Sequence, residues 1–109
     1  MYQVISSIVM NGDRVLEIDV SECPEISSQL VISLLRCPSV RRVSLRGCKS
    51  IGGRQARAIV RAALFRDEQL FVDLTDTAAV TTDIHELPRL LSLANYAGVA
   101  IEIGQSAYN

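Results

Sequence analysis

The sequence predicts an α/β protein in which a strand and a helix alternate as a repeated unit and the strands form one parallel sheet. Two observations carry this prediction. The stretches VLEIDVSEC (15–23) and VRRVSLRGC (40–48) share one pattern of apolar residues that ends in cysteine. An apolar–polar–apolar triplet also recurs after 25, 29 and 29 residues, starting at Ile18, Val43, Val72 and Ile101.

The chain of 109 residues is long enough for one domain with a sizeable core, so we expect a single domain over 1–109. Its N-terminal cap covers 1–14, and its repeats start near 15, 40, 69 and 98. Apolar residues make up 49% of the chain and aromatic residues only 5%, which predicts an aliphatic core.

The cap is expected to be a β-hairpin. Asn11-Gly12 stands between two apolar stretches, and this dipeptide suits the two-residue turn that joins antiparallel strands, because both turn positions need positive φ. We therefore expect a strand over 3–10 that folds back antiparallel onto 14–20.

Helices are expected in the intervals between triplets, because apolar residues recur there every three or four positions. The expected ranges are 26–36, 52–66 and 83–98. Pro88 lies inside the last range, so that helix either begins there or kinks, and Gly98 is a suitable C-terminal stop.

Strands that are linked by helices run parallel, so equivalent positions should lie side by side, about 4.8 Å apart, in rows across the sheet. The first row is Glu17, Arg42, Phe71 and Ala100. The second row is Asp19, Ser44, Asp73 and Glu102. The third row is Ser21, Arg46, Thr75 and Gly104.

The stretch from 15 to 60 closely resembles the cysteine-containing leucine-rich repeats of F-box substrate adaptors. The residues that carry the resemblance are Cys23, Pro24, Ile26, Cys37, Pro38, Cys48 and Ile51. From 67 onward the match is looser, and Thr77 stands in the cysteine position. The resemblance implies a short solenoid of about four strand–helix units, in which the repeated cysteine is buried and bonds to the backbone. The sequence contains no F-box, so a ubiquitin-ligase role is not expected.

The same order of elements also resembles the STAS domain of anti-sigma-factor antagonists, which is the alternative fold. That resemblance implies a regulatory domain that binds a regulatory protein. In that family a serine at the start of the second helix is phosphorylated. Here Gly52 and Gly53 occupy the corresponding turn, and Ser50 is misplaced.

The sequence predicts no enzyme, no cofactor, no metal and no catalytic residue. His85 is the only histidine and has no expected partner, whereas a triad or metal site needs several converging groups. The three cysteines lack CxxC spacing, so we expect buried structural thiols. The stretch KSIGGR (49–54) precedes a helix, but it matches neither phosphate-binding glycine motif, so a tight turn is expected.

The charge pattern points instead to binding. No carboxylate occurs from Ile26 to Arg66, and Arg54, Arg57 and Arg61 are spaced to share one helix face. We therefore expect a non-catalytic interaction module or adaptor. It would bind a protein partner through the sheet face or through the basic central repeat. The basic central repeat would suit an acidic partner. The candidate partner-binding residues are Glu17, Asp19, Arg42, Ser44, Arg46, Phe71, Asp73, Glu102, Arg54, Arg57 and Arg61.

Other partners are not expected. The net charge of −1 argues against nucleic acid or a membrane surface as a general target of the whole molecule. The first residues lack the basic start of a secretory signal, and the odd number of cysteines suits a reducing compartment, so we expect a cytoplasmic protein. The last strand, 99–104, would be a sheet edge, where self-association or a partner chain is expected.

Overall fold

The computed structural model describes residues 7–11, 14–66 and 68–104. Within these residues one five-stranded sheet has the order β1-β2-β3-β4-β5, which is the order of the chain. β1 pairs antiparallel with β2, and each later pair is parallel. The strands are β1 (Ser7–Asn11), β2 (Arg14–Asp19), β3 (Arg42–Ser44), β4 (Leu70–Asp73) and β5 (Val99–Glu102).

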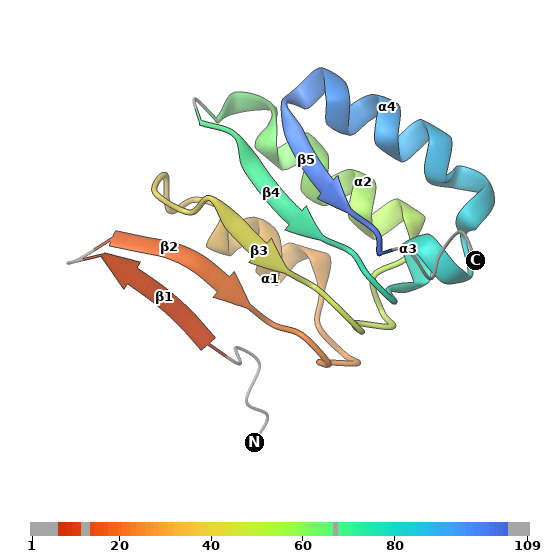
Figure 1. Ribbon diagram of the computed structural model, residues 1–109, viewed down its shortest axis with the longest axis horizontal. Helices are drawn as coiled ribbons and strands as arrows, with labels where there is room; N and C mark the ends of the chain where they lie inside the picture. The colour runs from red at the N-terminus through yellow and green to blue at the C-terminus, as the bar shows by residue number, and fades with distance from the viewer. Residues whose placement is uncertain (1–6, 12–13, 67, 105–109) are drawn as a thin grey trace.

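The helices lie on one face of the sheet, behind it in Figure 1. Helix α1 contacts α2, and α2 contacts both α3 and α4, so the helices form a continuous layer. The helices are α1 (Ser28–Leu34), α2 (Gly53–Ala62), α3 (Ala78–Thr81) and α4 (Leu87–Ala97), with 3₁₀ turns η1 (Ala63–Phe65) and η2 (Ile84–Glu86). The sequence did not predict α3, which is only four residues long.

The first two of the expected rows across the sheet are confirmed, whereas the third lies beyond the paired residues of the strands. The register pairs Glu17 with Arg42 and Arg42 with Phe71, and the first row ends at Ala100. In the second row the neighbours are Asp19, Ser44, Asp73 and Glu102, in that order. The antiparallel hairpin is also confirmed over β1 and β2, whereas the expected turn at Gly12 and the start of the first strand at 3–6 lie outside the described residues.

Local signals explain where the helices begin and end. The hydroxyl of Ser27 accepts a hydrogen bond from the Leu30 backbone N–H at 3.1 Å, which caps α1. Pro88 lies in the first turn of α4, so the helix begins there rather than kinking. Gly98 ends α4 with φ of 72°, a left-handed conformation that glycine adopts without steric cost.

The three turns that follow β2, β3 and β4 share one backbone feature. The third residue after each of these strands is left-handed, with φ of 62° at Glu22, 76° at Gly47 and 61° at Asp76. The residue after each left-handed position points into the core or toward it. Only Gly47 adopts this conformation freely, so the other two turns carry a backbone cost of about 1 kcal/mol each.

The core lies between the sheet and the helix layer. The inward side chains of β2, β3 and β4 are almost fully buried, as are their partners on the helices. The sheet contributes Ile18, Val20, Val43, Leu45, Leu70, Val72 and Leu74. The equivalent residues Ile101 on β5 and Ile103 just after it are only partly buried, because no further described strand covers them. The core is aliphatic, as the composition predicts.

Candidate functional site

The open face of the sheet is organised around one arginine. The guanidinium of Arg42 lies 4.5 Å from the centre of the Phe71 ring, close enough for cation–π attraction. Its Nε is 3.6 Å from Oε1 of Glu17 on β2, and its Nη2 is 3.8 Å from Oε2 of Glu102 on β5. A single side chain therefore links all four parallel strands. The three charged side chains are 40–48% exposed, so these ion pairs contribute little to stability.

A depression of about 310 Å³ lies beside Arg42 on the same face. Its floor is polar, because the hydroxyls of Ser21 and Ser44 share a hydrogen bond of 2.8 Å. The lining residues are Glu17, Ile18, Asp19, Ser21, Arg42, Ser44, Arg46 and Asp73. Seven of these eight residues carry polar or charged side chains, so the depression suits a polar segment of a partner.

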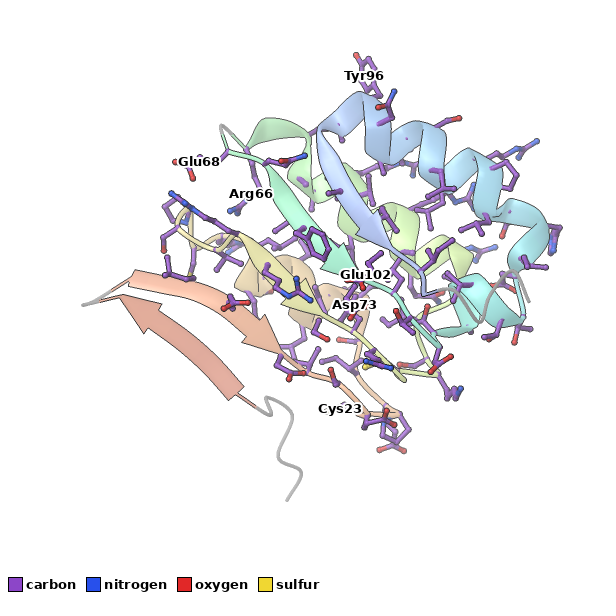
Figure 2. All side chains as sticks on the ribbon, in the orientation of Figure 1. Cys23, Arg66, Glu68, Asp73, Tyr96 and Glu102 are labelled. Carbon is purple, nitrogen blue, oxygen red and sulfur yellow. The ribbon has the colours of Figure 1, made fainter. Side chains whose placement is uncertain are left out.

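Two acids of the second row have a structural role that the sequence did not reveal. Oδ1 of Asp19 accepts from the Ser21 backbone N–H at 2.8 Å, and Oδ1 of Asp73 accepts from the Thr75 N–H at 2.9 Å. These bonds close the turns after β2 and β4. Figure 2 shows Asp73 and Glu102 side by side, yet Asp73 is only 6% exposed. The expectation that Asp73 lies open on a partner-binding row is therefore wrong, whereas Glu102 is exposed.

Arg46 is the second cation of this face, and its side chain is exposed. Among the described residues no ion pair involves Arg46, in contrast to Arg42. The sheet face thus offers one arginine that is already held by its neighbours and one whose charge is left for a partner.

The expected basic face on α2 is only partly available. Arg54 and Arg61 are exposed, but Nη2 of Arg57 pairs with Oε1 of Glu86 at 3.2 Å, and this side chain is 24% exposed. The expectation that Arg57 is free to bind a partner is therefore wrong, because its side chain links α2 to η2. At the start of α2 the backbone N–H of Gly53 donates to Oδ2 of Asp83 at 2.8 Å, so the chain itself occupies this anion-binding end.

Arg66, the last residue of the stretch without carboxylates, is held by backbone carbonyls. Its Nη1 donates to the carbonyl oxygens of Leu35 at 2.6 Å and Cys37 at 3.3 Å. Its Nη2 donates to the carbonyls of Pro38 at 3.2 Å and of Val40. One guanidinium therefore holds the whole connection between α1 and β3, including the last carbonyls of the helix.

The repeated cysteine position has the geometry that the resemblance implies in two of its three copies. Cys48 is fully buried and its thiol donates to the Val20 carbonyl at 3.0 Å. Thr77 is also fully buried, and its hydroxyl donates to the Leu74 carbonyl at 2.7 Å. Cys23, in the first turn, is partly buried and its Sγ lies 3.8 Å from the Ser21 carbonyl. The expectation of buried thiols is wrong for Cys37, which is exposed.

The buried thiol predicts a pH dependence of stability. Burial raises the pKa of the Cys48 thiol, so the folded protein keeps this proton to a higher pH than the unfolded chain does. The unfolded state then binds fewer protons, and stability falls as the pH passes the unfolded value. We therefore expect the free energy of unfolding to fall as the pH rises through the ordinary pKa of a free thiol, about 8.5.

Urea denaturation across this pH range measures the effect. The matched variant is Cys48→Thr, because Thr77 shows that threonine fits the equivalent turn. The variant should lose less stability than the wild type over the same range, and equal slopes for the two proteins would contradict the assignment.

Comparison of the chain with protein-family models, with curated proteins and with solved structures gives no match. The described residues contain no group of three or more His, Cys, Asp or Glu side chains that is placed to hold a metal ion. No helix in the described part of the chain is long and apolar enough to cross a membrane. His85 is exposed on η2. The functional conclusion therefore depends on the geometry of the surfaces.

Proposed function

We propose that the protein is a non-catalytic interaction module of the leucine-rich repeat type, which binds a protein partner through the open face of its sheet. The observation that carries this proposal is the stack of Arg42 on Phe71 at the centre of that face. Arginine and aromatic side chains provide most of the binding energy at protein interfaces, especially when they are held in place before binding.

The repeat assignment has support from three features of the turns and the sheet. The strands stand in chain order, and positions 44 and 73, and 73 and 102, are neighbours. The residue before Cys23, Cys48 and Thr77 is left-handed each time. These regularities suit a solenoid of stacked units, in which each unit covers the apolar side of the one before.

No observation favours the STAS-like alternative. The hydroxyl of Ser50, the serine nearest to the expected phosphorylation position, donates to the Ile26 carbonyl at 2.5 Å. A regulatory serine would need to lie open at the start of the helix. The proposal extends to a cytoplasmic location, with a protein rather than nucleic acid or a membrane as the partner.

The proposal is tested by quantitative affinity purification with mass spectrometry, in which the wild type and a sheet-face variant serve as baits. The variant Arg42→Glu/Arg46→Glu reverses both cations of the face. We expect the capture of at least one specific partner to fall by about tenfold, since the reversed charges then repel the acidic groups of that partner.

The comparison variant is Arg54→Glu/Arg61→Glu, which makes the same charge change on the helix layer, and it should still capture the proteins that the sheet-face variant loses. A second variant, Arg42→Gln/Phe71→Ala, removes the anchors without adding charge, and circular dichroism checks that each bait is folded. Undiminished capture by both sheet-face variants would rule this surface out.

A further inference from the structure

A second set of free cations lies on the other side of the molecule from the sheet face, although the net charge of the chain is only −1. The second surface is the outer face of the helix layer. From 26 to 66 and from 77 to 98 the sequence has just two acids, Asp83 and Glu86. Both are used internally, because Asp83 accepts from the Gly53 N–H and Glu86 pairs with Arg57.

Four other cations of this layer are free by contrast. All are arginines, their side chains are exposed, and within the described residues no ion pair joins any of them to an acid. They are Arg36, Arg54, Arg61 and Arg89. We name this set the helix-layer arginines.

Their placement follows from the parallel topology. Helices α1, α2 and α4 each precede a strand of the parallel part of the sheet, so they run in one direction. Arg54 and Arg89 therefore lie near the starts of α2 and α4, and Arg61 and Arg36 lie near the ends of α2 and α1. Arg54 and Arg61 are two helical turns apart, or about 10 Å along α2.

A large aromatic side chain projects from the same layer. Tyr96 on α4 is 82% exposed, and Figure 2 shows it pointing away from the molecule. Tyrosine and arginine are the side chains enriched at protein interfaces, whereas acids are depleted there. The net charge of −1 gives the whole molecule no general attraction for a large polyanion such as duplex DNA.

We propose that the helix layer is a second docking surface, which binds an acidic segment of a protein through the helix-layer arginines. This inference extends the proposed function, since it gives the interaction module a partner on each face. The arginine fork binds carboxylates with two parallel hydrogen bonds. An acidic helix with carboxylates two turns apart would match the spacing of Arg54 and Arg61.

The test uses a labelled helical peptide of about 16 residues, roughly four turns, with glutamates two turns apart, and the same peptide with glutamine in their place. Fluorescence anisotropy should show that the glutamate peptide binds and that the glutamine peptide binds about tenfold or more weakly. Arg54→Glu/Arg61→Glu should weaken the glutamate peptide by about tenfold or more. Arg42→Glu/Arg46→Glu, the sheet-face control, should leave its affinity within about twofold.

Duplex DNA of similar charge and phosphatidylserine vesicles complete the test. Equal or tighter binding of either one, lost in the Arg54→Glu/Arg61→Glu variant, would overturn the proposal in favour of a nucleic acid or a membrane. Equal affinity of the glutamate peptide for wild type and for this variant would also overturn it. Either outcome leaves the sheet-face proposal standing, because that proposal predicts losses only in the Arg42 and Arg46 variants.

Discussion

Replacing Leu45 with alanine is expected to lower the free energy of unfolding by about 3–4 kcal/mol. Leu45 is fully buried, and it stands between the equivalent positions Val20 and Leu74 of the neighbouring turns. Removing its side chain therefore opens a cavity in the core between the two neighbouring strands. Urea denaturation followed by circular dichroism measures the loss.

The matched variant is Ile103→Ala, at the equivalent position after β5. Ile103 is only partly buried, and the described sheet covers it on one side only. Its replacement should cost about half as much as that of Leu45 or less. Equal losses would contradict a stack of units in which the interior unit has two covered sides.

Replacing Arg66 with alanine is expected to cost about 3 kcal/mol of stability. The guanidinium donates to four carbonyls of the connection between α1 and β3, and two of them, those of Leu35 and Val40, lie in partly buried surroundings. Without the arginine these carbonyls lose charged donors and the end of α1 loses its cap. Thermal and urea unfolding report the change.

Two variants separate this role from the loss of a surface charge. Arg61→Ala removes an exposed arginine of the same helical region and should change stability by no more than about 0.5 kcal/mol. Arg66→Lys keeps the charge but lacks the planar fork, so an intermediate loss is expected. A stability of Arg66→Ala close to that of Arg61→Ala would disprove the capping role.

The register of the sheet could be predicted from the sequence because apolar–polar–apolar triplets leave little choice. A shift of one residue would turn Val43 outward and bury Arg42, and it would do the same in each strand. The rows that start at Glu17 and Asp19 therefore followed from the triplets alone. The short α3 could not be predicted, since four residues hold no full period of apolar positions.

The roles of individual arginines could not be predicted in the same way. Arg57, Arg61 and Arg66 all lie in the basic stretch from 26 to 66, which contains no carboxylate. The structure separates them, because Arg57 meets an acid and Arg66 meets carbonyls from segments that are distant along the chain. Such partners depend on tertiary contacts, which helical spacing does not encode. Of these three arginines only the exposed Arg61 remains free to bind a partner.

The acids of the second row show the same limit. Asp19 and Asp73 both stand two residues before a serine or threonine, and each accepts a backbone N–H bond in its turn. The repeated Asp-x-Ser/Thr spacing was the available signal for this role. The sequence alone presents these residues as a charged stripe, whereas the structure uses one oxygen of each to close a turn.

The central claim is that the parallel strands stand side by side in chain order and so form the proposed binding face. Disulfide formation between cysteines engineered at positions 44, 73 and 102 tests this claim. In a background with Cys23→Ser and Cys37→Ser, the pair Ser44→Cys/Asp73→Cys should oxidise readily to an intramolecular disulfide, because adjacent strands lie about 4.8 Å apart. The control pair Ser44→Cys/Glu102→Cys spans two strand intervals, roughly 10 Å, and should remain reduced under the same conditions. Oxidation of the control pair as fast as the adjacent pair would contradict the strand order and remove the sheet face on which Arg42 and Phe71 meet.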